Sequence, residues 1–172
     1  GRRFHVSFIC SGNICRSPIA EKVFAREVEQ AGLADRVRVT SAGTGSWHVG
    51  DPADARAAAL LAGHGYDDTH VARQIDDELL DADLLVALDA GHLRALRRIA
   101  PDPERIRLLR DFGNEPLYLT VLFSSSTNTA RAITPCNGPS AIATPQRSPK
   151  PRSRTSEAAV TLLMPSVSQK RF

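Results

Sequence analysis

The chain has 172 residues, 42% of them hydrophobic, which is enough for one domain with a sizeable core. No apolar run approaches a membrane span and the start of the chain lacks the apolar core of a signal peptide, so we expect a cytoplasmic protein, or one secreted without a signal peptide. Three cysteines are too few for a disulfide framework. The net charge of +3 is uneven, because residues 1–112 carry 15 basic and 17 acidic side chains and residues 113–172 carry 7 and 2.

A predicted strand over residues 4–10 is followed by a short loop and a helix. In the loop, Gly12 permits close approach to a ligand and Asn13 tolerates a left-handed backbone. Backbone N–H groups of such a loop and of the helix start converge on one point, which is typical of an anion site. The candidate phosphate-binding residues are Ser11, Gly12, Asn13, Ile14, Cys15 and Arg16.

Apolar side chains at helical spacing predict the helix over residues 18–31, and Gly32 ends it. We assign Ser17 as the N-cap of this helix and Pro18 as its first residue. The Ser17 hydroxyl can also hydrogen-bond the thiolate of Cys10 and help it leave in a second reaction step.

Cys10 and Arg16 are the residues on which the chemistry depends. The positive field at the helix start favours the thiolate form of Cys10, which makes it a nucleophile, and Arg16 offers a planar fork for two phosphate oxygens. This arrangement predicts phosphoryl transfer through a cysteinyl-phosphate. The bare spacing is also compatible with a buried cysteine and an exposed arginine that meet by chance. Cys15 is either a buried structural thiol or the partner of Cys10 in a reversible disulfide.

Strands and helices alternate through the rest of the first 112 residues. We predict strands over 37–40, 84–88 and 106–109, helices over 53–62 and 90–99, a Gly-rich loop over 41–52 and an acidic helical turn over 76–81. Leu93, Leu96 and Ile99 are expected to face the core. The alternation favours a parallel sheet with helices on both faces, and such sheets bind ligands at the carboxyl ends of their strands, where Cys10 lies.

The segment from Cys10 to Ser17, with Pro18-Ile19-Ala20-Glu21 after it, resembles the active-site signature of the low-molecular-weight protein tyrosine phosphatases. The likeness continues in order through Thr40 to Gly43, Trp47 to Gly50, His64-Gly65, His70 to Gln74 and Leu88-Asp89. It covers residues 4–112, and it implies a small, doubly wound, three-layer α/β sandwich with a four-stranded parallel sheet.

The resemblance also assigns roles around the loop. It places Trp47 and His48 at the mouth of the substrate pocket, where the Trp47 ring stacks on an aromatic substrate. His70 is either a catalytic base or, as we favour, a histidine that hydrogen-bonds the loop through Asn13 or Ser41. Asp89 is either a second carboxylate at the pocket edge or, as we expect, a helix N-cap. No metal or other cofactor is needed, because the loop and its arginine supply the electrostatic stabilisation.

The sequence does not supply the general acid of the family. Relatives carry a late Asp-Pro-Tyr-Tyr loop whose Asp protonates the leaving phenolate, a contribution of typically about 10²–10⁴ in rate. Asp102-Pro103 lacks the aromatic residues, and we interpret it as a turn between a helix and a strand. Glu115, followed by Pro116-Leu117-Tyr118, is a weak candidate, so the general acid is unknown.

Residues 113–172 do not resemble the family. They include 9 Ser, 7 Thr and 7 Pro, which supply little core, so we expect a largely irregular or disordered tail. The family's C-terminal helix is not found in this segment. The abrupt change suggests a frame-shifted or replaced ending, which the encoding DNA would decide. The tail is basic but has few aromatic residues, and we expect neither a nucleic-acid nor a membrane partner.

We therefore expect a monomeric phosphatase that acts on phosphotyrosine proteins or small aryl phosphates and is impaired by the loss of its acid. One alternative is a catalytically dead remnant that binds phosphate or phosphotyrosine. An arsenate reductase is disfavoured because residues 76–95 hold no cysteine to relay a disulfide and Cys136 lies in the tail. A phosphoarginine phosphatase is disfavoured because Ile14 stands where such enzymes usually have Thr.

Overall fold

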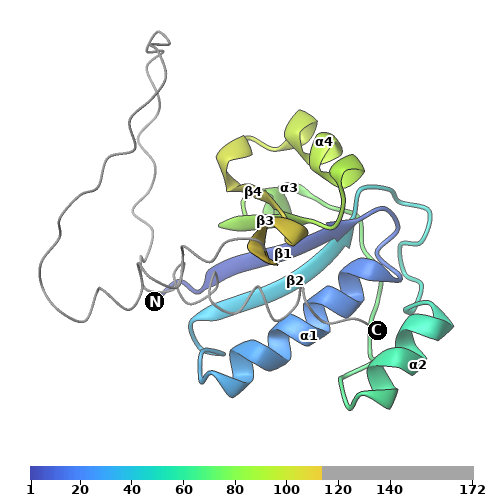
Figure 1. The fold of residues 1–172 in the computed structure, drawn as a ribbon. Coiled ribbons are helices and arrows are strands. Elements are labelled where there is room, and N and C mark those ends of the chain that lie inside the picture. Colours follow the sequence, from blue (N-terminus) through green and yellow to red (C-terminus); the bar gives the residue numbers. More distant parts are fainter. Residues whose placement is uncertain (114–172) are drawn as a thin grey trace, which may run out of the picture.

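The computed structural model describes residues 1–113, so the tail predicted over 113–172, including Glu115, lies outside the described residues except for its first residue. Figure 1 shows the order of the elements along the chain. They are β1 (Phe4–Cys10), α1 (Arg16–Gln30), β2 (Val37–Gly43), α2 (Ala55–Gly63), α3 (Asp77–Leu80), β3 (Leu84–Ala87), α4 (Ala90–Ile99), the 3₁₀ turn η1 (Pro103–Arg105), β4 (Ile106–Leu108) and the 3₁₀ turn η2 (Leu109–Gly113).

The four strands form one parallel sheet in the order β2-β1-β3-β4. The central strand β1 is buried along its whole length, and its Val6 pairs with Val39 on one side and Leu84 on the other. The chain leaves β1 for β2 on one side and later returns to β3 on the other. The gap between the carboxyl ends of β1 and β3 is therefore the switch point at which such sheets bind ligands.

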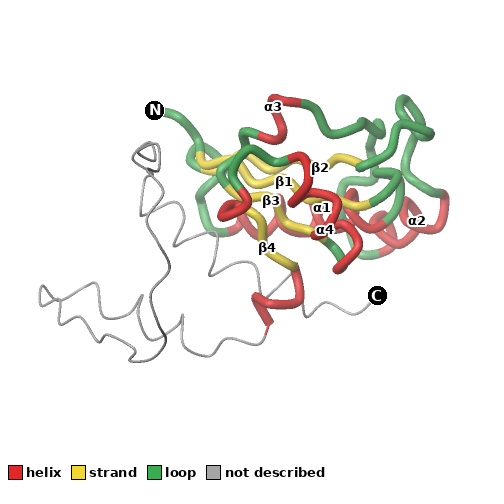
Figure 2. The backbone as a smooth tube through the Cα atoms, turned by 90° about the horizontal axis from the view of Figure 1, so that it is seen from above, coloured by secondary structure: helices red, strands yellow, loops and turns green. Residues whose placement is uncertain are grey.

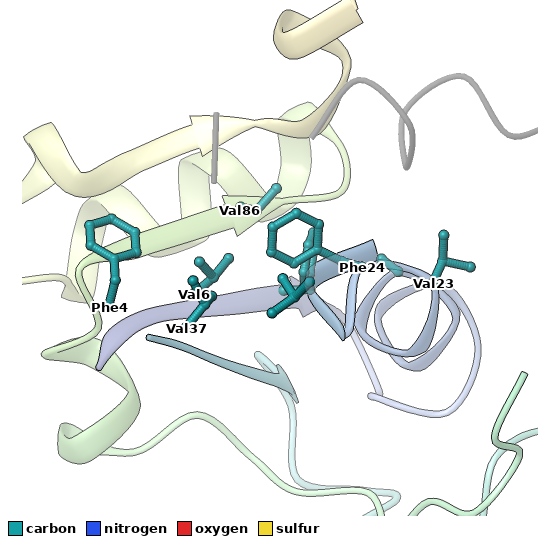
Figure 3. Packing of buried hydrophobic residues seen from close by; sticks show 9 residues of the cluster. Phe4, Val6, Val23, Phe24, Val37 and Val86 are labelled. Atoms are coloured by element: carbon teal, nitrogen blue, oxygen red, sulfur yellow. The ribbon is translucent and has the colours of Figure 1, made fainter. Parts of the chain in front are cut away.

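Helices cover both faces of the sheet, which confirms the predicted three-layer α/β fold (Figures 1 and 2). On one face α1 packs on β1 and β2, and α2 lies next to α1. There the rings of Phe8 and Phe24 meet edge to face with 5.6 Å between centroids. Both rings belong to a hydrophobic cluster with Val23 and Val86, part of which is labelled in Figure 3. On the other face α4 packs on β3 and β4, and Leu79 of α3 and Leu96 of α4 are fully buried in one cluster with side chains of the sheet.

Three sequence-based expectations are wrong in detail. The helix α1 begins at Arg16, and Ser17 is not its N-cap: the capping position is Cys15, which makes no side-chain capping bond. Strand β2 continues to Gly43, because its last residues pair with the end of β1. Ile99 is 49% exposed rather than in the core, because it lies at the last turn of α4, beyond the cover of the sheet.

Two other predictions are confirmed. Asp102 caps the 3₁₀ turn η1 between α4 and β4 by accepting the backbone N–H of Glu104 at 3.1 Å, as expected of a turn residue. The acidic helical turn is present as α3. Within residues 1–113, no helix is long and apolar enough to cross a membrane.

Candidate active site

The Cys10 side chain lies at the end of β1, buried and surrounded by hydrogen-bond donors. Its Sγ accepts the backbone N–H of Asn13 at 3.3 Å and lies 2.9 Å from Oγ of Ser17. Ser17 Oγ accepts a hydrogen bond from Asn13 Nδ2 at 2.9 Å, and its own hydroxyl hydrogen can donate either to the sulfur or to the more distant Ala42 carbonyl at 3.5 Å. Ser17 is fully buried in the first turn of α1, so this hydroxyl faces the thiol instead of capping the helix.

Asn13 is the residue that fixes the shape of the loop. It is fully buried and has a left-handed backbone (φ 57°), a conformation that Asn tolerates better than most residues. Its Nδ2 donates to Ser41 Oγ at 2.9 Å, its Oδ1 accepts the backbone N–H of Arg73 at 2.9 Å, and its carbonyl accepts from His70 Nε2 at 2.6 Å. Ser41 donates in turn to Glu21. His70 therefore supports the loop as we favoured.

The carbonyl groups of the loop point away from the thiol. Ser11 O accepts from Gly45 N at 2.9 Å and Ile14 O accepts from Asp54 N at 2.7 Å. Within the part of the chain that the structure describes, the backbone N–H groups of Gly12, Ile14 and Cys15 donate to no acceptor. Free N–H groups at a helix start are typical of anion sites, so the anion site predicted from the sequence stays a prediction at this loop.

Trp47 and His48 lie against this loop. A Cβ atom added at Gly12 would stand 2.8 Å from His48 Cδ2 and 3.3 Å from Trp47 Nε1, so a larger residue would push both side chains away. The Trp47 side chain is 66% exposed, and His48 Nδ1 lies 2.9 Å from Asp51 Oδ2. Both residues thus border the loop at the surface, where the resemblance had placed the mouth of a pocket.

Arg16 and Asp89 meet at the switch point between β1 and β3. Arg16 Nη1 donates to Asp89 Oδ2 at 2.6 Å, and both side chains are partly exposed. Asp89 Oδ1 also accepts the backbone N–H of His92 at 2.9 Å, which confirms Asp89 as the N-cap of α4. The hydrogen bond from His92 and the one from Arg16 lower the pKa of Asp89 to about 2, against the opposing effect of burial.

Sequence reasoning missed His92. Its Nε2 lies 2.9 Å from Ser11 Oγ and 3.5 Å from Arg16 Nη2. The available signal was its place in the first turn of a helix that starts at a strand end, because such side chains lean back toward that end.

Cys15 is exposed, so it is not a buried structural thiol. Among residues 1–113, no group of three or more His, Cys, Asp or Glu side chains could hold a metal ion.

The fold and the loop together define a class: a doubly wound α/β protein with a cysteine inside a phosphate-type loop at its switch point. A family model described as low molecular weight phosphotyrosine protein phosphatase matches residues 5–118. The chain belongs to this family.

Three similar proteins illustrate the match. A low molecular weight protein-tyrosine phosphatase A from Mycobacterium tuberculosis is 58% identical over 108 residues, which are 63% of this chain and 66% of that protein. A low molecular weight protein-tyrosine-phosphatase from Streptomyces coelicolor is 56% identical over 113 residues, 63% of this chain and 69% of the relative. The solved structure of Primo-1 is 43% identical with a TM-score of 0.60 and covers 68% of this chain and 77% of its own. The chain thus spans about two thirds of its curated relatives.

Proposed function

We propose that this protein hydrolyses aryl phosphate monoesters, phosphotyrosine in proteins among them, through a cysteinyl-phosphate on Cys10. The observation that carries the proposal is the placement of Cys10 Sγ, which is buried at the strand end, accepts the Asn13 N–H at 3.3 Å and lies 2.9 Å from the Ser17 hydroxyl oxygen. Donors around a sulfur stabilise its thiolate, which is the nucleophilic form.

The reaction proceeds in two displacements at phosphorus. The Cys10 thiolate forms the S–P bond while the P–O bond to the aryl group breaks, and the phenolate leaves with a proton from an acid or from solvent. Water then attacks phosphorus, gives up a proton, and releases inorganic phosphate and the thiolate. Throughout, the free N–H groups of the loop and the Arg16 fork bind the phosphoryl oxygens, and the Ser17 hydroxyl donates to the departing sulfur.

Two side chains at the surface of the loop favour an aryl substrate. The exposed ring of Trp47 lies against the loop and offers a face on which a phenol ring can stack. Ile14 gives the loop an apolar side chain where a phosphoarginine phosphatase usually has Thr. The names of the similar proteins support the same substrate class.

We infer that the protein acts as a monomer in the cytoplasm.

The proton donor for the leaving group is the one component of the proposed reaction to which we assign no residue. Asp89 adjoins the loop, but its pKa of about 2 keeps it ionised at neutral pH, so it is not suited to protonate a leaving group. Glu115, the weak candidate from the sequence, lies outside the described residues. We therefore propose that the rate depends strongly on how well the substrate's phenolate leaves without help.

The test compares p-nitrophenyl phosphate, which has a good leaving group, with phenyl phosphate, which has a poor one, for the wild type and Cys10→Ser. We expect slow, Cys10-dependent release from the first substrate and much less from the second. Absence of Cys10-dependent release from both would overturn the proposed reaction. Protection of Cys10 from iodoacetate by inorganic phosphate would then support the remnant that only binds phosphate. Equal rates would reveal a proton donor, and Glu115→Gln tests that candidate.

A further inference from the structure

We propose that His92 is a positioning residue for the phosphate loop: its neutral imidazole accepts the Ser11 hydroxyl and borders the Arg16 guanidinium, and protonation of the ring reverses the Ser11 hydrogen bond, repels Arg16 and weakens phosphate binding. The inference rests on the proposed function and adds to it a residue and a proton-linked control. Hydrogen bonds around the thiol join Cys10, Asn13 and Ser17. His92 instead contacts Ser11 and Arg16.

His92 contacts the first and the last residue of the loop, Ser11 and Arg16. The side chain is 6% exposed and projects from the first turn of α4, which packs against β3 and β4. Its Nε2 lies 2.9 Å from Ser11 Oγ, 81 residues earlier in the chain, and 3.5 Å from Arg16 Nη2. A single ring nitrogen therefore touches both ends of the segment that surrounds the phosphate.

The neighbours of the ring decide which nitrogen carries the proton. Arg16 can only donate, so Nε2 must accept, and the Ser11 hydroxyl can donate to the same nitrogen. The proton then lies on Nδ1, which is buried 3.2 Å from Asp89 Oδ1 and finds no well-aligned acceptor in the described part of the chain. The other tautomer would turn an N–H toward the guanidinium and a lone pair toward the carboxylate, and both contacts would be repulsive.

Few charges face the ring from the elements around it. They are Asp89 at the start of α4 and Arg16 from α1. Strand β3 has no ionisable side chain, and the Arg107 side chain of β4 donates to backbone carbonyls instead. Burial lowers the pKa of His92, Asp89 opposes this effect and Arg16 reinforces it, so the ring is neutral at pH 7.

Protonation would reverse both contacts at once. An N–H on Nε2 cannot accept from Ser11, so the hydroxyl hydrogen must turn away and the Ser11 oxygen becomes the acceptor. The imidazolium would also repel the guanidinium of Arg16 and compete with it for Asp89. The guanidinium of Arg16 is then no longer held in place before phosphate arrives. Binding must therefore immobilise the arginine side chain, and this cost lowers the affinity for phosphate.

The experiment measures phosphate binding separately from turnover. Inorganic phosphate is titrated as a protector of Cys10 against iodoacetate in the wild type and in His92→Leu, His92→Gln and Ser11→Ala. Gln can place a carbonyl oxygen near the position of Nε2 but does not titrate, whereas Leu offers no acceptor. Arg98→Gln, on the exposed part of the same helix, is the matched control. Hydrolysis of p-nitrophenyl phosphate is followed in parallel.

We expect His92→Leu and Ser11→Ala to weaken phosphate binding about five-fold, the equivalent of one net hydrogen bond, and His92→Gln to stay near the wild type at neutral pH. As the pH falls below 6.5 and the ring becomes protonated, the wild type should lose more affinity than His92→Gln, a comparison in which the titration of phosphate itself cancels. If His92→Leu fails to fold, Ser11→Ala removes the same contact and must show the loss.

Equal phosphate affinity in Ser11→Ala and the wild type would overturn the positioning role, and parallel pH profiles of His92→Gln and the wild type would overturn the proton link. Both results leave the proposed function intact if the wild type still hydrolyses the ester. If phosphate fails to protect Cys10 in the wild type and no Cys10-dependent hydrolysis occurs, the proposed function itself is wrong, and the inference falls with it.

Discussion

Arg16 Nη1 donates to Asp89 Oδ2 across 2.6 Å, although the two residues are 73 positions apart in the chain. The contact exists because β1 and β3 are neighbours and the segments after them leave the same edge of the sheet. One carboxylate thus serves two purposes: its Oδ1 caps α4, and its Oδ2 holds the arginine that we expect to bind phosphate.

Replacement of Asp89 should separate its two roles. Asn caps helices about as well as Asp, so Asp89→Asn should keep the free energy of unfolding, whereas Asp89→Ala should lower it by about 1 kcal/mol. Both variants lose the ion pair that holds Arg16, so both should raise KM for p-nitrophenyl phosphate several-fold. Urea unfolding and steady-state kinetics provide the two readouts. An unchanged KM in both variants would show that the pair does not orient the arginine.

Asn13→Ala should damage stability as well as activity. The substitution removes the side-chain bonds to Ser17, Ser41 and the Arg73 N–H and leaves the Arg73 N–H without its acceptor, a loss of roughly 2–4 kcal/mol in the free energy of unfolding. Asn13→Gly loses the same bonds but adopts the left-handed backbone freely, so it should be about 1 kcal/mol more stable than Asn13→Ala. If the two variants unfold at the same urea concentration, the left-handed backbone carries no measurable cost.

Gly45→Ala should displace Trp47 without unfolding the protein. A Cβ atom at Gly45 would stand 1.7 Å from the Trp47 ring, and the exposed ring contributes little to stability. We expect Gly45→Ala and Trp47→Ala to raise KM for p-nitrophenyl phosphate by roughly two- to ten-fold, the value of an aromatic contact, and to leave the affinity for inorganic phosphate unchanged.

Gly63→Ala is the matched control for this prediction, because nothing lies within 4 Å of the added atom. Trp47 is the single tryptophan of the chain, so its fluorescence reports whether the ring has moved. A displaced ring together with an unchanged KM would refute the role of Trp47 in binding the aryl group.

His5 should make stability depend on pH. Its Nε2 lies 2.8 Å from Thr40 Oγ1, and burial, reinforced by the charge of Arg38, lowers its pKa from 6.5 to about 4. The unfolded chain therefore binds a proton before the folded one does, so this contribution to stability is complete above pH 6.5 and is lost as the pH falls toward 4. The loss should be on the order of 1–3 kcal/mol.

His5→Gln isolates this effect from the carboxyl groups that titrate nearby. The difference in the free energy of unfolding between the wild type and His5→Gln should shrink as the pH falls from about 7 to about 4.5. The measurement is urea unfolding at several pH values, and a constant difference would contradict the buried neutral state of His5.

The sequence predicted those features whose signals are local. Strands and helices follow from the spacing of apolar residues, and α4 has the predicted bounds. Ser17 shows where local rules failed, because a serine before a proline is a common N-cap but here its hydroxyl faces the Cys10 sulfur. The same rules placed Ile99 in the core from its spacing alone, although the sheet does not reach the last turn of α4.

By itself, the sequence determined the family and predicted the nucleophile, the phosphate loop and the arginine, because these are encoded within one short segment, Cys10 to Ser17. The tertiary structure alone decided which distant groups hold that segment: Arg73 on Asn13 from 60 residues away, Asp89 on Arg16 from 73 and His92 on Ser11 from 81. Periodicity and capping rules act over a few residues, whereas these contacts depend on which strand ends a parallel sheet brings together.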